Sequence, residues 1–569
     1  MLGLMQDWPL LCHKVIDHAA VQHPHREVLS RSVEGPMHRT TYADIRARSL
    51  RLAKRLQREG IAPGDRVATM AWNTWRHLEC WYGVLGCGAV YHTLNPRLFP
   101  EQIAWIMRDA EDRLLFVDAT FAPIVAAIAP IVPSLERTVV LCAAADMPEG
   151  LPNALPYEEW LAEADDDFRW LPDDERQAAG MCYTSGTTGD PKGVVYSHRS
   201  NVLHAMAAAM PDFLSLSSRD RLMPVVPFFH ANGWSTAFSG PMTGAGLVLP
   251  GPGMDGASIH EMLDAGRVTI TAAVPTVWAG LLDHLRGSGE GLPHLQRVVI
   301  GGSACPRSMA EAFERDYDVR VLHAWGMTEM SPLGSFASPK PETDGLDRDA
   351  WLDVQETQGH PPFTVELKVT DDDDRPLPWD GRTFGRLRAR GAAVASGYYR
   401  GRGAECFDAE GWFDTGDVAH IDPNGYMRIT DRAKDVVKSG GEWISTIELE
   451  NLASAHPDVA EAAAIGVPDD RWGERPLLIV VAREGATPSA ADVLGAIEGR
   501  VARWWVPDRV EFVDAIPHTA TGKIRKTALR ERFGSTAAPP GAASARAASA
   551  GAASPDVAPP GVASPGTDG

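Results

Sequence analysis

The chain has 569 residues, which is too long for one compact core, so we expect at least two domains. With 44% hydrophobic and 23% charged residues it has the composition of a soluble globular protein, and its formal charge of -21 argues against nucleic acid or an anionic membrane surface as the main partner. Its seven cysteines are odd in number and lack a CxxC spacing, so they suggest neither a disulfide framework nor a zinc site and fit a reducing cytoplasm.

The first part of the chain alternates between helix-like and strand-like segments. The opening MLGLMQDWPLL has no basic flank and no apolar run is long enough to cross a membrane, so we expect neither a signal peptide nor a membrane span. Thr41 and Asp44 form a capping-box pattern, and apolar residues recur at helical spacing until Gly60, which predicts an amphipathic helix. Short β-rich runs follow at residues 66–70, 114–117, 138–141, 269–272 and 297–300. This alternation predicts an α/β fold with largely parallel sheets up to about residue 340.

One stretch, TSGTTGDPKG from Thr184 to Gly193, carries the clearest chemical signal. Its glycines let the backbone approach a ligand, its hydroxyl groups donate to phosphate oxygens, and Lys192 supplies a positive charge. It is not the P-loop of NTPases, because Lys192 is followed by glycine instead of serine or threonine. Such a composition is also typical of a solvated loop. The apolar runs on both sides, MCY and VVY, favour phosphate binding over that alternative.

Two further motifs follow in the same α/β part. FFHANGW, from Phe228 to Trp234, is an aromatic cluster around His230, and a histidine beside aromatic rings is more often packed than catalytic, so we expect it to position a ligand. GGSACP, from Gly301 to Pro306, directly follows the predicted strand 297–300. A loop at the carboxyl end of a strand is where α/β sheets bind their ligands.

Two later motifs offer groups that suit a nucleotide. In HAWGMTE, from His323 to Glu329, the flat face of Trp325 suits a purine, and Thr328 and Glu329 offer oxygen atoms, of which those of Glu329 would hold Mg²⁺ together with Thr184. Alone, a Thr-Glu pair would more often be a helix cap. In WFDTGDV, Asp417 is a carboxylate that can accept from ribose hydroxyls, although an aspartate in such a turn is ordinarily a turn former.

From about Phe363 the sequence no longer alternates between helix-like and strand-like segments. VELKV and GRLRARG, separated by the acidic DDDDRPLPWDG, predict a β-hairpin with a solvated turn. A second domain is predicted to begin near residues 431–435, to contain the strand LLIVVA at 477–482, and to end near Phe533. Beyond it, Ser535 to Gly569 is almost wholly Ala, Pro, Gly and Ser, which cannot bury enough apolar surface to offset ordering, so we expect a disordered tail.

Together with KSGGEWIS, from Lys438 to Ser445, and TATGKIRK, from Thr519 to Lys526, these motifs resemble the signatures of the adenylate-forming superfamily in spelling and order. The superfamily includes acyl-CoA synthetases, luciferases and peptide-synthetase adenylation domains. The spelling is most similar to bacterial medium- and long-chain fatty acyl-CoA synthetases and 3-methylmercaptopropionate:CoA ligases. The resemblance implies a multidomain α/β fold: an adenylation domain at 1–433 with parallel sheets and a small β-barrel-like part, a mobile α+β domain at 434–533, and a tail at 534–569.

The resemblance also implies roles for the motif residues. Catalysis is expected to use Lys523, Lys192 and Glu329, and Mg²⁺ is expected on Thr184 and Glu329. ATP and AMP are expected to contact Thr184, Ser185, Gly186, Thr187, Thr188, Gly302, Ser303, His323, Ala324, Trp325, Thr328, Asp417, Arg432 and Lys434. The acyl pocket and its gate are expected to contain His230, Ala231, Trp234 and Gly301. CoA is expected to contact Lys438, Gly440, Gly441, Glu442 and Trp443.

The activity implied is ATP-dependent, AMP-forming ligation of a carboxylate to CoA through an acyl-adenylate. The expected acids are alkanoates, either 3-methylmercaptopropionate or a fatty acid, and the enzyme is expected to be a cytoplasmic homodimer. The open alternatives are a carrier-protein-loading adenylation enzyme, an inactive nucleotide-binding paralogue and, less favoured, a luciferase-type oxidase. One departure from the branch is Ala393, which stands where relatives often have tryptophan.

The composition of the C-terminal segment predicts that it is dispensable. Truncation after Gly534 should leave turnover and solubility unchanged, because the removed residues cannot contribute to a packed core. Steady-state rates of the full-length and truncated enzymes check this. A large loss of either property would show that the tail binds something.

Overall fold

The computed structural model describes residues 1, 3–151, 153–184, 190–439, 442–469, 471–518 and 524–534, with the backbone alone at 442 and 443. The predicted tail from Ser535 lies outside these ranges. So do Ser185 to Thr188, Gly440, Gly441 and Lys523.

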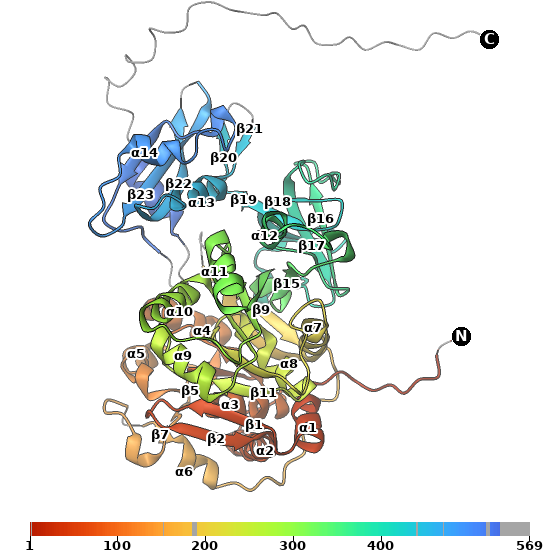
Figure 1. The fold of residues 1–569 in the computed structure, drawn as a ribbon. Helices are drawn as coiled ribbons and strands as arrows, with labels where there is room; N and C mark the ends of the chain where they lie inside the picture. The colour runs from red at the N-terminus through yellow and green to blue at the C-terminus, as the bar shows by residue number, and fades with distance from the viewer. Residues whose placement is uncertain are drawn as a thin grey trace, which may run out of the picture.

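Two mainly parallel sheets form the large N-terminal part (Figure 1). The first has seven strands, in the order β7 (Leu155–Pro156), β6 (Arg137–Val140), β5 (Asp112–Val117), β3 (Arg66–Met70), β4 (Val90–Thr93), β8 (Ala178–Thr184) and β9 (Lys192–Ser197). The second has eight, in the order β15 (Leu333–Phe336), β14 (Arg320–Gly326), β13 (Arg297–Gly301), β12 (Ile270–Ala273), β10 (Arg221–Pro224), β11 (Gly246–Leu249), β1 (Glu27–Arg31) and β2 (Met37–Thr41). Antiparallel pairing is confined to sheet edges, at β8–β9, β14–β15 and β1–β2.

Helices cover both faces of each sheet, which gives five layers. The central layer shares one core with both sheets and contains α1 (His13–Gln22), α2 (Tyr42–Arg58), α3 (Trp75–Gly86), α6 (Tyr157–Ala162), α7 (His198–Ala209) and α8 (Thr236–Thr243). The outer face of the seven-stranded sheet carries α4 (Pro100–Ala110) and α5 (Ala122–Ile128). The outer face of the eight-stranded sheet carries α9 (Gly256–Ala265), α10 (Pro275–Ser288), α11 (Arg307–Tyr317) and α12 (Arg348–Gln355). Parallel sheets need this double cover, because their strands are apolar on both faces.

The local signals in the sequence are confirmed here. Thr41 caps α2, with its hydroxyl accepting from the Asp44 backbone N–H and the Asp44 carboxylate accepting from the Thr41 backbone N–H. All five predicted β-rich runs agree with a strand to within two residues at each end, and the run 66–70 coincides with β3. The runs 138–141 and 269–272 are each displaced by one residue from β6 and β12.

A four-stranded antiparallel sheet follows, in the order β16 (Val365–Thr370), β17 (Gly385–Gly391), β18 (Phe413–Ile421) and β19 (Met427–Arg432). Val365 pairs with Gly391 and Thr370 with Arg386, so the predicted hairpin is confirmed. Trp325 and Met330 from the edge of the eight-stranded sheet pack into the core of this small sheet. It stands where the resemblance implies a small barrel-like part, and its outer strands are β16 and β19.

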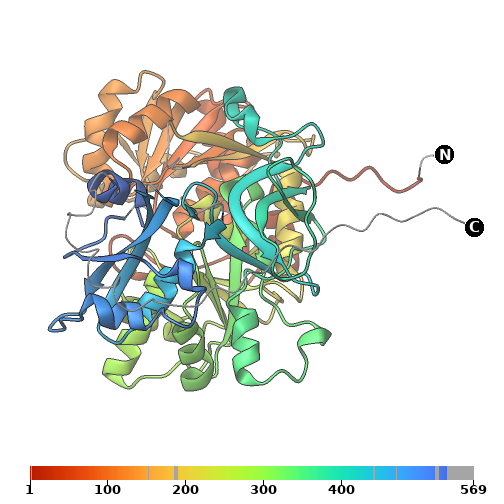
Figure 2. The ribbon, with the colours of Figure 1, turned by 90° about the horizontal axis from the view of Figure 1, so that it is seen from above.

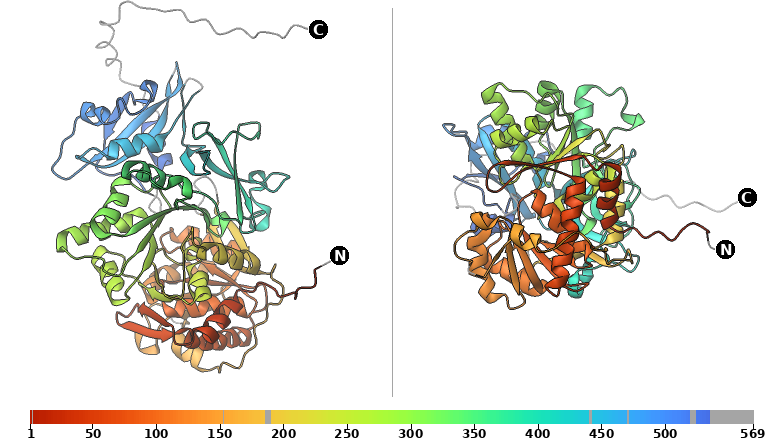
Figure 3. Two further views of the ribbon diagram at one scale, coloured as in Figure 1. Left: turned by 45° about the vertical axis from the view of Figure 1, so that its right-hand side comes forward. Right: turned by 90° about the horizontal axis from the view of Figure 1, so that it is seen from below.

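The C-terminal part has its own sheet, in the order β21 (Glu442–Ile444), β20 (Val437–Ser439), β23 (Gly473–Ala482) and β22 (Val459–Asp469), with β24 (Arg509–Phe512) also paired to β23. Its helices, α13 (Thr446–Ser454), α14 (Ala490–Gly495) and α15 (Lys526–Phe533), cover both faces. Figures 1, 2 and 3 show this smaller unit at one end of the large one.

The two units contact each other where the chain passes from one to the other. Asp431, buried at the end of β19, accepts from the backbone N–H and the hydroxyl of Thr446 on α13. On the other side of the predicted boundary at residues 433 and 434, Asp435 forms an ion pair of 2.8 Å within the C-terminal unit, with Arg530 on α15. None of the helices in the described ranges is long and apolar enough to span a membrane.

Candidate functional site

A cavity of about 800 Å³ lies at the carboxyl ends of strands from both parallel sheets and is lined by residues of all three sheet-bearing parts. From the seven-stranded sheet it is lined by residues at or just after the ends of β4 and β8, including Thr93, Leu94 and Thr184. From the eight-stranded sheet come residues at the ends of β10, β12, β13 and β14, including Val225, Ala273, Gly301 and Trp325. This edge is where α/β sheets place their ligands.

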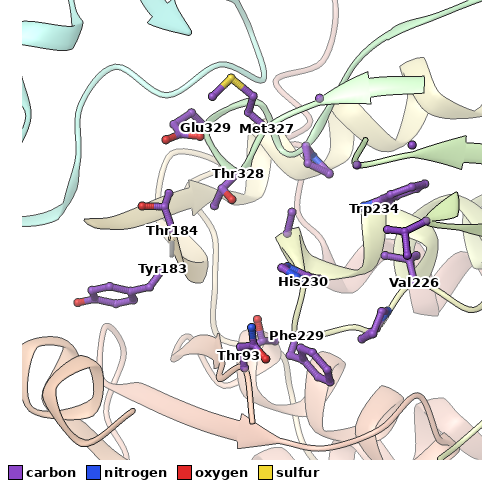
Figure 4. Close-up of a pocket in the computed structure, with 18 of the residues that line it drawn as sticks. Thr93, Tyr183, Thr184, Val226, Phe229, His230, Trp234, Met327, Thr328 and Glu329 are labelled. Atoms are coloured by element: carbon purple, nitrogen blue, oxygen red, sulfur yellow. The ribbon is translucent and has the colours of Figure 1, made fainter. Parts of the chain in front are cut away.

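The cavity has a polar end. Thr184, Thr328 and Glu329 lie together there in Figure 4, and Lys192 from β9 also lines it. Glu329 is buried, and its Oε1 accepts a hydrogen bond of 2.6 Å from the hydroxyl of Tyr398. Burial and the adjacent Glu329 carboxylate raise the pKa of Tyr398, so this hydroxyl remains a donor. One oxygen of Glu329 is thereby oriented by the protein.

Lys192 is held beside the same tyrosine. Its Nζ lies 5.0 Å from the Tyr398 ring centroid and 3.9 Å from Glu405 Oε1. Both partners leave the ammonium group at the cavity wall, where it offers a positive charge to an anion. Ala393 belongs to the segment that supports this end, because its carbonyl accepts from the Ser331 hydroxyl at 2.8 Å and the nearby Ala395 N–H donates to the Glu329 carbonyl.

Asp417 links two sheets behind the cavity wall. It is buried on β18, and its two carboxylate oxygens accept from Trp325 Nε1 at 3.1 Å and pair with Arg432 Nε at 2.9 Å. Both partners line the cavity, as do Thr415 and Gly416, whereas Asp417 itself is not among the lining residues. Asp417 therefore positions an indole ring and a guanidinium group at the wall. Its direct contact with ribose stays a prediction.

Two of the expected nucleotide contacts, His323 and Ser303, are not among the residues that line the cavity, so their contact with the nucleotide stays a prediction. His323 is buried on β14, and its Nδ1 lies 3.1 Å from the Gln355 carbonyl of α12, on the outer face of the sheet. Burial lowers the pKa of His323 to about 4, so the ring is neutral near pH 7 and brings no charge to a phosphate. Of the same two motifs, Gly302, Ala324, Trp325 and Thr328 do line the cavity.

The opposite end of the cavity is aromatic. Phe229, His230 and Trp234 project from the segment that precedes α8, as Figure 4 shows. A Cβ added to Gly301 would lie 3.0 Å from the tip of the Trp234 ring and 2.9 Å from the Ala324 carbonyl. Glycine at this strand end therefore allows the indole to lie against the backbone.

The backbone that presents Trp234 is left-handed over five consecutive residues, from Ala231 to Ser235. Asn232 anchors this turn, because its side chain accepts from the Thr93 hydroxyl at 2.9 Å and donates to the Tyr91 hydroxyl at 3.3 Å. A Cβ on Gly233 would approach the Phe228 ring to 2.5 Å, so that residue packs too closely for a side chain. Tyr91 and Thr93 come from β4, so the anchor joins the two parallel sheets.

The C-terminal unit contributes one side of the cavity. Lys434, Asp435 and Ile524 line it, and Ile524 is the residue after Lys523. Burial lowers the pKa of the Lys434 ammonium group. Lys438, expected to contact CoA, lies on β20 paired with Trp443 of β21 and is not among the lining residues.

Many of the lining residues were not named by the sequence reasoning, and two of them, Tyr398 and Arg97, bear on the chemistry of the site. Tyr398 lies in the SGYY segment, whose position beside Glu329 could be known only from the fold. Arg97 follows β4, and its guanidinium carbon lies 6.0 Å from the Phe229 ring centroid. The aromatic segment 228–234, from which the acyl pocket was predicted, contains no arginine. Because the Arg97 residue is exposed, its charge lies at the rim of the cavity.

The protein has two stacked parallel sheets and a cavity at their carboxyl edges, with one polar and one aromatic end. A smaller C-terminal domain lines one side of this cavity. Together these features define an adenylate-forming enzyme. The chain belongs to the AMP-binding enzyme family. The family model for AMP-binding enzymes matches residues 16–399, and the model for the AMP-binding enzyme C-terminal domain matches residues 448–523.

Similar proteins agree with this assignment. The chain is 50% identical over 537 residues to 3-methylmercaptopropionyl-CoA ligase of Ruegeria pomeroyi, covering 94% of this chain and 99% of the relative. It is 47% identical over 539 residues to medium-chain-fatty-acid–CoA ligase of Ectopseudomonas oleovorans, covering 94% and 98%. Among solved structures, ATP-bound MatB from Rhodopseudomonas palustris is similar with a TM-score of 0.78 and 27% identity, covering 91% of this chain and 99% of that one.

The two ends of the cavity predict two separable mutant effects. Asp417→Ala should raise KM for ATP about 10- to 100-fold, because it removes hydrogen bonds to a charged group that together contribute about 1.5–3 kcal/mol. Trp234→Ala should instead change the preferred length of the acyl chain and leave KM for ATP nearly unaltered. Steady-state kinetics with both substrates varied measure this.

Trp379→Ala is the matched control for the tryptophan change, because Trp379 is exposed and does not line the cavity. This variant should have the same KM for ATP and the same acyl-chain preference as the wild type. Equal effects of Asp417→Ala and Trp234→Ala on both substrates would contradict the division of the cavity into two ends.

Proposed function

We propose that this protein is an ATP-dependent, AMP-forming acyl-CoA ligase that activates an apolar carboxylic acid. The observation that carries the proposal is the single cavity whose polar end holds Lys192 and Glu329 and whose other end is walled by Phe229 and Trp234. A substrate carboxylate at the junction of the two ends would meet the α-phosphate of ATP with its hydrocarbon tail among the aromatic rings. The similarity to named CoA ligases supports CoA as the acyl acceptor.

The first half-reaction makes the carboxylate a better acyl donor. A carboxylate has no usable leaving group, so one of its oxygens attacks the α-phosphorus of ATP and pyrophosphate departs. Negative charge builds on the phosphoryl oxygens, and preorganised positive groups stabilise it better than water does. We assign this role to Lys192 and Lys523, with the loop residues Ser185, Gly186, Thr187 and Thr188 and the wall residue Lys434 as further contacts to the nucleotide.

The residues at the polar end suit Mg²⁺. Thr184 offers a hydroxyl oxygen, and Glu329 has one carboxylate oxygen engaged by Tyr398, which leaves the other for an ion. Oxygen ligands of this kind, few in number, are typical for Mg²⁺ that shares its shell with phosphates and water. When bound, the ion would neutralise part of the charge on the phosphates.

The second half-reaction transfers the acyl group. The CoA thiolate attacks the acyl carbonyl, the C–O bond to AMP breaks, and the thioester and AMP form. We assign CoA to Lys438, Gly440, Gly441, Glu442 and Trp443. Ile524 lines the cavity whereas Lys438 on β20 is not among the lining residues, so we propose that the small domain turns about the linker near Lys434 for this step.

The proposal also covers the oligomeric state and the cellular compartment of the enzyme. We infer a cytoplasmic homodimer, and the cysteines fit a reducing compartment, because all seven lie in the described ranges and are free thiols. Size-exclusion chromatography with light scattering tests the dimer.

The aromatic end of the cavity predicts the acid preference. Butyrate and octanoate should be turned over faster than succinate, because a second carboxylate at the aromatic end would lose its hydration without gaining an ion pair. A panel of acids from acetate to palmitate, with 3-methylmercaptopropionate and succinate, scored by CoA-thioester formation, measures this. Arg97→Gln should keep the order of the panel. If succinate led and depended on Arg97, the proposal of an apolar acid would be wrong.

The position of Lys523 in the small domain predicts that the two half-reactions depend on it differently. Lys523→Ala should slow acyl-AMP formation about 10²- to 10³-fold, the scale of losing one preorganised transition-state donor. Given synthetic acyl-AMP and CoA, the same variant should form thioester at a near-native rate, because no phosphorus is attacked in that step. Pyrophosphate release and thioester formation are measured in parallel. Loss of both rates together would assign Lys523 to the fold or to CoA instead.

A further inference from the structure

Three side chains with metal-binding atoms meet on the outer surface of the large domain, away from the cavity. His260 lies on α9, His284 on α10, and Glu290 in the loop after α10. Figure 1 shows α9 and α10 next to each other on the outer face of the eight-stranded sheet. Within the ranges that the structure describes, this is the one group of three or more His, Cys, Asp or Glu side chains close enough to share an ion.

The end of helix α10 places Glu290 beside the two histidines. Helix α10 ends at Ser288, and Gly289 follows with a φ of +73° and its N–H bonded to the Leu285 carbonyl. This left-handed cap reverses the chain direction. Glu290 therefore lies against the two histidines instead of extending into solvent.

The distances match the edges of a small coordination polyhedron. Glu290 Oε2 lies 3.0 Å from His284 Nε2 and 3.3 Å from His260 Nδ1, and all three atoms are within 4.8 Å of one another. Zinc bound at about 2.0–2.1 Å in a tetrahedron separates its ligand atoms by roughly 3.3 Å. Small side-chain rotations would bring the three atoms to that spacing.

The hydrogen bonds at His260 favour a cation between these atoms. Its Nε2 lies 3.0 Å from the Gly291 carbonyl, which can only accept, so Nε2 carries the proton. In the neutral ring Nδ1 is then a bare lone pair, and it faces the carboxylate of Glu290. Two acceptors face each other favourably only if the ring is protonated or a cation lies between them. An imidazole whose far nitrogen donates to a carbonyl is also the usual arrangement of a metal-binding histidine.

We propose that His260, His284 and Glu290 form a binding site for a first-row transition-metal ion of the Zn²⁺ class, which fastens α9, α10 and the following loop to one another. Two imidazoles and a carboxylate are the donor set for such ions, whereas Mg²⁺ prefers oxygen alone. Three protein ligands leave the fourth position to water. None of the three lines the cavity, so the site is separate from the nucleotide and its magnesium.

A metal ion at this site would stabilise a helix that also lines the cavity. Helix α10 begins at Pro275, and Thr276 and Val277 in its first turn line the cavity wall. Its last turns carry His284. A metal ion there would hold the distal end of this helix in place and stabilise the domain by binding only the folded chain.

The test is a Co²⁺ titration of the full-length, untagged enzyme, followed in visible absorption and then displaced by Zn²⁺. The wild type should bind one ion per chain with the strong bands of a tetrahedral site. His284→Ala and Glu290→Gln should each raise Kd at least about tenfold, the lower bound seen when even a supporting residue is removed. His294→Ala, a histidine in the same connection outside the cluster, should bind like the wild type.

A second readout does not depend on the colour of the ion. Zn²⁺ should raise the Tm of the wild type and of His294→Ala, and should raise the Tm of His284→Ala and Glu290→Gln much less. The use of two variants guards against one that folds poorly. An absence of saturable binding in the wild type, or binding and Tm shifts equal in all four proteins, would overturn the site. Displacement of Co²⁺ by millimolar Mg²⁺ as readily as by Zn²⁺ would overturn the assigned metal class.

Discussion

The cavity depends on one constraint, which is that parallel strands direct all their carboxyl ends to the same edge of a sheet. Both large sheets obey it, and their edges converge, so loops that are far apart in sequence meet without any loop being long. The central helix layer fixes the distance between the sheets, because it shares one apolar core with both of them. The Asn232 side chain then joins the loop before α8 to β4 directly.

The third sheet connects the cavity to the small domain through neighbouring residues of one strand. On β19, Arg432 pairs with Asp417 toward the cavity, whereas Asp431 accepts from Thr446 of the C-terminal unit. Successive residues of a strand point to opposite faces, so this division follows from strand geometry. A change in the position of the small domain would first affect the contact between Asp431 and Thr446. Arg432, the next residue on the strand, lines the cavity.

Much of the fold was predictable because its signals are local, whereas the residues that meet in space could not be read from the sequence. The capping box at Thr41 and the strand at 66–70 need only their neighbours in sequence, and both were confirmed. His323 was assigned to the nucleotide from its motif, and only the structure shows that its Nδ1 lies beside the Gln355 carbonyl of α12. Arg97 was missed because more than a hundred positions separate it from the aromatic segment that it accompanies.

The left-handed turn from Ala231 to Ser235 has a consequence for redesign of the enzyme. Four of its five residues carry a Cβ, and each such residue in that conformation costs about 1–2 kcal/mol, which the surrounding packing must offset. The backbone there has little freedom to move when a pocket is reshaped. Libraries that vary side chains along this turn should therefore yield folded proteins with new acid preferences, whereas insertions, deletions or grafted loops should mostly yield insoluble ones. Glycine or asparagine at positions 231 and 235 would relieve the strain and widen the set of tolerated neighbours.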